Sequence, residues 1–186
     1  QVINPPFDED FIREIRGISD EWLGKRSERG FSMGWFDEEY LSRTPIAVIR
    51  ESGKVVAFAN LMPLYDDETI SVDLMRLKND IPSGTMDALF VYLFQWSKDN
   101  GYKKFNLGMA PLSGVGNDAY SFNEEKLVGL LYRHGQKFYS FEGLRRYKEK
   151  FQPDWQNKYV AYPKELNISL LLLEIVKLTS KSPRKS

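Results

Sequence analysis

An aspartate and an arginine interrupt an apolar run in the segment 71–76, which reads Ser-Val-Asp-Leu-Met-Arg. Burying the Asp73 carboxylate beside leucine and methionine costs free energy unless it is paired, so Asp73 indicates a partner or a ligand. Residues three apart in a regular strand face opposite sides of the sheet, so Asp73 and Arg76 could share one cleft only if a β-bulge lies between them. A structural ion pair, or two separate surface charges, would explain the spacing equally well.

A second charged segment, residues 141–151, has helical spacing. Glu142, Arg146 and Lys150 recur at four-residue steps and would line one face, where Glu142 and Arg146 can pair. Arg146 and Lys150 are like charges one turn apart, and an anionic ligand such as phosphate or carboxylate would relieve their repulsion. A solvated helix face is the alternative. A separate, core-facing stripe is predicted to contain Leu144, Tyr147 and Phe151.

Other sequence features limit the chemistry. The small, apolar loop 107–116 follows a predicted strand and could line a ligand cleft or simply connect two elements. His134 is the only histidine and there is no cysteine, so we expect neither a metal centre built from these residue types nor a cofactor. His134 lies beside Gly135 at a predicted helix end, where a capping role is natural and a general-base role has no support.

Composition is typical of a folded domain. The chain has 186 residues, of which 42% are apolar and 14% aromatic, and 26 basic residues balance 26 acidic ones. Zero net charge argues against a surface coated in basic residues, although a local basic stripe remains open. The chain begins with Gln1, and its most apolar run, 168–178, is shorter than the roughly 20 residues that a membrane span needs. We therefore expect a soluble fragment of a longer protein.

Hydrophobic periodicity predicts an α/β order with a mixed sheet. The predicted helices are Asp8–Arg29, Thr85–Asn100, Asn123–His134, Glu142–Phe151 and Lys164–Lys177. The predicted strands are Ile46–Arg50, Val55–Met62, Thr69–Leu77, Lys104–Leu107 and Trp155–Ala161, with a short run at Lys137–Ser140. Gly53 would supply a left-handed turn position between the first two strands, and the first three strands would form an antiparallel meander.

This order is similar to that of the GCN5-related N-acetyltransferase (GNAT) superfamily. Acetyl-CoA-dependent members cradle the pyrophosphate in a glycine-rich loop, and the equivalent stretch here, 76–84, contains Pro82 and a single glycine. Proline removes one backbone donor from such a cradle, so a different acyl donor is the simplest account. We expect an N-terminal helix and linker (1–45), an acyltransferase-like core (46–163) and a C-terminal amphipathic helix with a basic tail (164–186).

Four ordered motifs make the resemblance more specific. They are Ser71–Arg76, Ile81–Asp87, Asn106–Gly114 and Phe138–Phe151, followed by Pro153, Trp155, Tyr159 and Tyr162-Pro163. Together they resemble the catalytic domain of the phosphatidylglycerol lysyltransferases, the lysylphosphatidylglycerol synthases or multiple peptide resistance factors, over about 46–163. The resemblance implies a fragment equivalent to the second of two acetyltransferase-like folds, on the cytoplasmic face of the bacterial membrane.

The resemblance also implies an activity and its partners. Lysyl-tRNA would donate its lysyl group to phosphatidylglycerol at the membrane surface, and the cationic lipid would protect against antimicrobial peptides. Membrane and first synthase-fold portions would accompany the chain, and self-association into a homo-oligomer is left open, as is alanine in place of lysine. The implied catalytic residues are Asp73, Arg76, Glu142, Arg146 and Lys150, and the implied substrate-binding residues are Lys158, Met109, Ser113 and Tyr147.

Three rival functions keep the same fold. They are a CoA-dependent acyltransferase, a peptidoglycan-type aminoacyltransferase that acts on a peptide amine, and a non-catalytic domain that has lost the chemistry.

Overall fold

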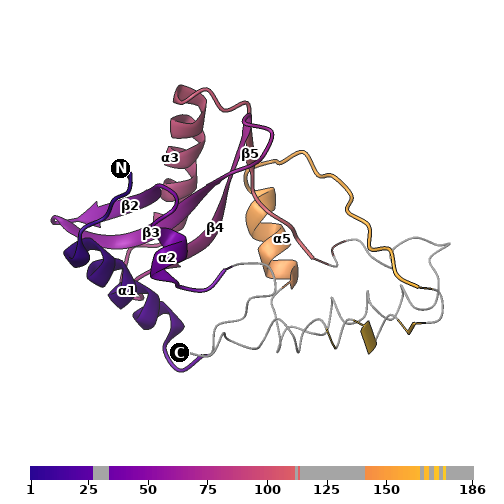
Figure 1. The fold of residues 1–186 in the computed structure, drawn as a ribbon, viewed down its shortest axis with the longest axis horizontal. Coiled ribbons are helices and arrows are strands. Elements are labelled where there is room, and N and C mark those ends of the chain that lie inside the picture. Colours follow the sequence, from indigo (N-terminus) through magenta and orange to yellow (C-terminus); the bar gives the residue numbers. More distant parts are fainter. Residues whose placement is uncertain are drawn as a thin grey trace. The chain divides into compact units, whose positions relative to one another are not determined.

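A computed structural model describes residues 1–26, 34–111, 113, 141–163, 166–167, 170–171 and 174 (Figure 1). Its contacts divide into two units, which comprise the described residues within 1–108 and within 109–179 respectively. The first unit contains β1 (Val2–Ile3), α1 (Glu9–Leu23), α2 (Glu38–Leu41), β2 (Ile46–Glu51), β3 (Lys54–Pro63), β4 (Thr69–Leu77), α3 (Thr85–Asp99) and β5 (Lys104–Asn106). The second contains α5 (Phe141–Glu149).

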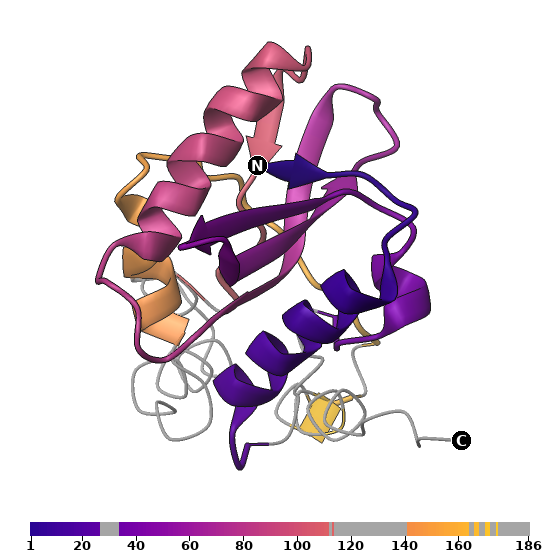
Figure 2. The same cartoon turned by 90° about the vertical axis from the view of Figure 1, so that its left-hand side faces the viewer.

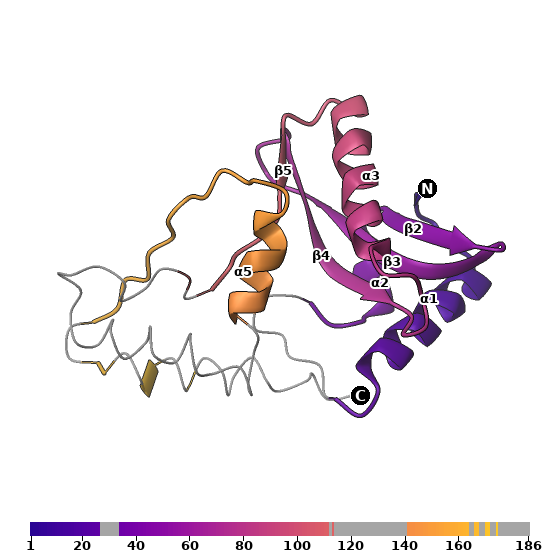
Figure 3. The ribbon, with the colours of Figure 1, turned by 180° about the vertical axis from the view of Figure 1, so that it is seen from behind.

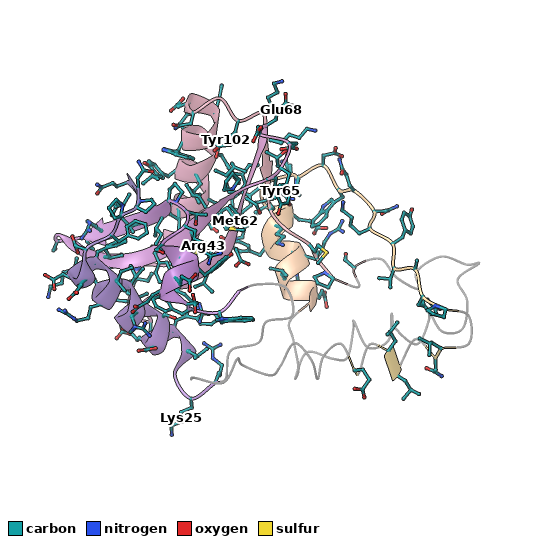
Figure 4. The ribbon with its side chains drawn as sticks, in the orientation of Figure 1. Lys25, Arg43, Met62, Tyr65, Glu68 and Tyr102 are labelled. Carbon is teal, nitrogen blue, oxygen red and sulfur yellow. The ribbon has the colours of Figure 1, made fainter. Side chains whose placement is uncertain are left out.

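The first unit is built on a five-stranded sheet in the order β1-β2-β3-β4-β5. The first four strands pair antiparallel and β5 joins β4 in parallel, which confirms the predicted mixed, mostly antiparallel sheet. Ser52 and Gly53 close the β2–β3 hairpin with φ values of 50° and 83°, so both adopt the left-handed conformation that a two-residue turn requires. At the opposite hairpin, Glu68 accepts a hydrogen bond from the backbone of Lys103, beside Tyr102 (Figure 4).

Helices cover both faces of this sheet (Figures 2 and 3). One apolar cluster joins α1 and α2 to the sheet, with Ile15, Leu41, Phe58 and Leu74 at 0% exposure. A second cluster joins α3 to the opposite face through Leu61, Ile70, Leu89 and Leu93. The side chains of β3 and β4 therefore reach either the α1 face or the α3 face.

Helix α1 begins where the sequence predicts and ends early. The Asp8 side chain accepts a hydrogen bond from the Phe11 amide at 2.6 Å and caps the first turn. The helix ends at Leu23 because Gly24 adopts φ 56°. The sequence analysis predicted a helix as far as Arg29, and this is wrong for the described residues 24–26, which are not helical. Gly24 ends the helix, although the apolar periodicity suggested no end at this residue.

A β-bulge in β4 is the feature that positions the site. Ala59 pairs with Met75 and Leu61 with Val72, so Asn60 alone lies opposite two residues, Asp73 and Leu74. The Leu74 amide donates to the Asn60 side-chain oxygen at 2.7 Å, and Asn60 is fully buried. This side chain takes the place of the ladder partner that the extra residue lost.

The bulge changes which face each side chain reaches. Val72 and Met75 pack against the α3 cluster. Leu74 belongs to the α1 cluster, Arg76 lies over the ring of Trp22 in α1, and Asp73 contacts Tyr40 of α2. Asp73 and Arg76 therefore share the α1 face, as only a bulge allows for residues three apart.

Other elements differ from the sequence predictions or lie outside the described residues. The strand predicted at Trp155–Ala161 is wrong: residues 152–163 form no helix or strand, and Lys158 through Ala161 are exposed. A strand needs a neighbour to pair its backbone groups, and the local residue types alone do not supply one. Neither β1 nor α2 was predicted. The predictions for 123–134, including His134, for 137–140 and for most of 164–177 fall on residues that are not described.

Within the described residues, none of the helices has the length and apolarity needed to cross a bilayer.

Replacing Asn60 by alanine should destabilise the chain, because the buried Leu74 amide would lose its acceptor. We expect the free energy of unfolding to fall by about 1–3 kcal/mol, measured by urea denaturation. Asn79→Ala is the matched control: Asn79 is exposed, and its amide side chain donates only a long 3.4 Å hydrogen bond to Glu21. A fall for Asn60→Ala no larger than that for the control would contradict the role given to the bulge.

Candidate functional site

The Asp73 carboxylate is held by donors from a segment far away in sequence. The Gly34 amide lies 2.9 and 3.0 Å from its two oxygens, and the Tyr40 hydroxyl donates to Oδ2 at 2.7 Å. Only glycine fits at position 34, because a Cβ there would lie 2.5 Å from Asp73 Oδ2. The carboxylate is thereby fixed in one orientation by two elements.

Tyr40 is a hydrogen-bond donor to this carboxylate and not a base. Burial, followed by the hydrogen bond to Asp73, raises the pKa of the Tyr40 hydroxyl to about 12, and the neighbouring Asn60 amide acts in the opposite direction. The hydroxyl also lies 3.3 Å from Sδ of Met62 on β3 (labelled in Figure 4). At neutral pH this phenol keeps its proton and presents it to Asp73.

A pocket of about 430 Å³ opens beside the carboxylate. Its lining consists of Gly34, Trp35, Asp37, Tyr40 and Asp73. Trp35 is 41% exposed, and Asp37 caps α2 by accepting from the Tyr40 amide at 2.7 Å. Two carboxylates and two aromatic rings in one pocket suit an organic cation, which the carboxylates pair with and the rings pack against.

Arg76 reaches the same face of the sheet but is buried. Its side chain is 3% exposed, and its guanidinium carbon lies 4.1 Å from the centroid of the Trp22 ring. Arg76 is not among the described residues that line the pocket, and its described contact is with the Trp22 ring.

In the second unit, Glu142, Arg146 and Lys150 lie along α5 and its end. Arg146 donates to Glu142 at 2.9 Å, which confirms the predicted pair, and the Arg146 side chain is 76% exposed. The Lys150 ammonium lies 4.7 Å from the centroid of the Tyr147 ring, which also meets the Phe151 ring edge-on. Arg146 and Glu142 are thus each other's partners, and Arg146 is the more exposed of the two, at 76% against 44%.

Two other cations of α5 hold the loop that contains Met109 and Ser113. The Lys148 ammonium donates to the Met109 carbonyl at 2.7 Å, and the Arg145 guanidinium donates to the Ser113 hydroxyl at 2.9 Å. Lys148 is 6% exposed, and burial lowers its pKa to about 8. Arg145 also pairs with Glu149 at 2.6 Å and stacks 3.6 Å from the centroid of the Trp155 ring.

The structure thus groups the candidate residues into separate sets. Asp73 and Arg76 share a face of the first unit, while Met109 and Ser113 meet α5 in the second. Lys158 is exposed on a segment without regular structure, and Tyr147 is half-buried.

Sequence reasoning missed the residues that support these sets. Tyr40, Gly34 and Asn60 lie in other elements, and no local pattern links them to Asp73. For Arg145 and Lys148 a signal did exist: the two are three apart, so one helix face presents both.

The Asp73–Tyr40 contact can be tested by titration. Replacing Asp73 by asparagine should lower the pKa of Tyr40 below about 12, because the carboxylate's hydrogen bond and charge both raise it, while burial remains. The pKa can be followed by NMR of ring-labelled tyrosine, with Tyr40→Phe used to assign the resonance. An unchanged pKa in Asp73→Asn would contradict the contact.

The amino-acid sequence is similar to those of bacterial phosphatidylglycerol lysyltransferases. It is 46% identical over its full length to the phosphatidylglycerol lysyltransferase of Bacillus subtilis and 44% identical over 96% of its length to that of Staphylococcus epidermidis. The chain spans only 22% and 21% of those proteins, about a fifth of their length.

Solved structures give the same relationship. The L-PGS structure from Bacillus licheniformis matches with a TM-score of 0.79 at 45% identity, covering 98% of this chain and 55% of that one. An aminoglycoside acetyltransferase from a soil metagenome matches with a TM-score of 0.51 at 11% identity, over 89% of this chain and 94% of that one. The latter likeness shows the acetyltransferase-like fold alone.

The family described as "Phosphatidylglycerol lysyltransferase, C-terminal" matches residues 1–162. That span contains the whole sheet, the Asp73 pocket and α5. The chain therefore belongs to the family of phosphatidylglycerol lysyltransferase C-terminal domains.

Proposed function

We propose that this chain is the aminoacyl-transferring domain of an enzyme that moves lysine from lysyl-tRNA to a glycerol hydroxyl of phosphatidylglycerol. Family membership supports the reaction class, and the B. subtilis relative has the corresponding name. The observation on which the proposal rests is the Asp73 carboxylate, fixed by Gly34 and Tyr40 at the wall of a pocket.

Asp73 binds an ammonium of the lysyl group in this proposal. A carboxylate with its orientation already fixed loses little entropy when it accepts a charge-assisted hydrogen bond. Trp35 and Tyr40 offer ring faces to the methylene chain or to the cation. Glu142 is the weaker candidate for this role because its exposed partner is a full positive charge, Arg146, whereas the donors to Asp73 are neutral and leave its charge uncompensated.

The composition of the pocket favours lysine over alanine. Asp37 and Asp73 both line it. A lysyl ester has two ammonium groups and an alanyl ester has one, so two carboxylates balance the charge of the lysyl group.

The reaction is a transesterification. The glycerol hydroxyl oxygen attacks the ester carbonyl carbon, the bond from that carbon to the tRNA ribose oxygen breaks, and the glycerol proton passes to the ribose oxygen. The ester is already activated, so the protein contributes mainly by orienting the reactants and stabilising the negative charge on the carbonyl oxygen. Arg76 supplies buried positive charge on the pocket's face of the sheet, and Tyr40, with its raised pKa, keeps its proton throughout.

The exposed cations at and near α5 have a different role from Asp73 in this proposal, namely the binding of phosphate. Arg146 and Lys150 are exposed and bind phosphate, either of the tRNA 3′ end or of the lipid headgroup. Met109, Ser113, Tyr147 and Lys158 remain proposed substrate contacts.

We place the domain at the cytoplasmic face of the membrane, beside the first synthase fold and the membrane part of the whole enzyme. The cationic lipid product would lower the affinity of the cell surface for cationic antimicrobial peptides.

The proposal is tested by exchanging the chain into the B. subtilis relative in place of its matching segment. The chimera is given radiolabelled lysyl-tRNA and phosphatidylglycerol vesicles, and label in the lipid is measured. Asp73→Asn keeps one acceptor oxygen, which at the Oδ2 position lies within reach of both Gly34 and Tyr40, but removes the charge, so we expect transfer to fall roughly 10- to 100-fold. Asp10→Ala, which breaks an exposed pair with Arg13, is the control and should leave transfer unchanged. Full transfer by Asp73→Asn would refute the ammonium role, and alanyl-tRNA used in parallel checks the amino acid.

Charge reversal at Arg146 should reduce transfer without unfolding the chain, because its side chain is exposed. We expect a loss of roughly tenfold or more, the scale of one charged hydrogen bond, measured in the same chimera. Arg43→Glu is a closely matched control: Arg43 is 67% exposed and pairs with a glutamate four residues earlier (Figure 4). Equal activities of the two variants would remove Arg146 from the site.

A further inference from the structure

We propose that Trp22 is a positioning residue for the transfer reaction and that it acts by holding the guanidinium of Arg76. The inference rests on the proposed function, since Arg76 is one of its charged residues. It adds a residue from α1, an element with no assigned part in the chemistry.

The contact joins the last turn of α1 to the end of β4. The guanidinium carbon of Arg76 lies 4.1 Å from the centroid of the Trp22 ring, and Arg76 is 3% exposed. An arginine over an indole is the strongest cation–π pairing, and desolvation strengthens it further. Trp22 therefore fixes the position of a buried charge.

Neighbouring contacts hold the two elements in register. The backbone amide of Asn79 donates to the Glu21 carboxylate at 2.8 Å. The residue before Trp22 is therefore hydrogen-bonded to a residue just after β4. Gly24 ends α1 two residues later and Arg26 turns back, donating to the backbone carbonyl of Leu23 at 3.2 Å. The indole thus projects from a helix end that is fixed on both sides.

Arg26 provides an internal comparison. Its guanidinium carbon also lies over the Trp22 ring, at 4.7 Å from the centroid. Arg26 is exposed, so its stacking is screened by water, whereas that of Arg76 is not. Only the buried partner is expected to influence the reaction.

A preorganised positive charge acts on the step in which negative charge develops. The carbonyl oxygen becomes negative only as the tetrahedral intermediate forms, so a well-placed Arg76 lowers the barrier without tightening ground-state binding. Loss of Trp22 should consequently lower kcat and leave KM for lysyl-tRNA nearly unchanged.

The test is a double-mutant cycle in the chimera described above, with kcat and KM measured for the wild type, Trp22→Leu, Arg76→Met and the double variant. We expect Trp22→Leu to lower kcat roughly 3- to 30-fold and to add nothing once Arg76 is methionine, because coupled residues are not additive. Trp22→Phe, which retains a ring face, should recover most of the activity. Arg26→Ala should behave as wild type.

Independent losses in the double variant would overturn the proposal, as would a Trp22→Leu chimera with wild-type kcat. A Trp22→Phe variant as inactive as Trp22→Leu, with an equal fall in thermal stability, would reduce Trp22 to a structural residue. A wild-type chimera that transfers no lysine would instead overturn the proposed function, and this control separates the two failures.

Discussion

The hydrogen bond from the Leu74 amide to the buried side chain of Asn60 is the contact on which the candidate site depends. An inserted residue leaves one backbone group without a ladder partner, and burying such a group is costly. Asn60 meets that requirement from the neighbouring strand, so the bulge is stable inside the sheet. Because the bulge is stable, an acidic residue and a basic residue three positions apart both face α1.

The arrangement separates a fixed anion from a buried cation. Asp73 opens into a pocket and is held by donors from Gly34 and Tyr40, while Arg76 lies beneath the ring of Trp22. Each charge is oriented by a neutral group from another element. Neither has to reorganise when a charged substrate arrives, and this is the condition under which electrostatic stabilisation is most effective.

Much of the fold could be predicted from the sequence, because its signals are local. The apolar runs of β2 to β4, the hairpin glycine and the apolar helix α3 each lie within one segment, and the structure confirms them. The bulge could be identified only as a condition for Asp73 and Arg76 to meet. Its cause, the Asn60 side chain, lies 14 residues away in sequence.

The supporting residues were unpredictable for a similar reason. Tyr40 and Gly34 contact Asp73 across sequence separations of 33 and 39 residues. A periodic pattern within one helix or strand cannot predict contacts between residues so far apart in sequence. The strand predicted at 155–161 is wrong for a different reason: its tyrosine, valine and tryptophan favour a strand locally, but the described residues supply no neighbouring strand. Helical phase on α5 also favoured Arg146, whereas its neighbour Arg145 makes the loop contact.

Gly34 has an implication for reading other sequences of this family. A Cβ at this position would lie 2.5 Å from Asp73 Oδ2, so the carboxylate keeps its orientation only because residue 34 has no side chain. A relative that retains aspartate at position 73 but has a larger residue at position 34 would have the charge without the space in which to orient it. This one position therefore offers a marker, readable from sequence alone, for separating members with an intact pocket from members whose pocket has been filled.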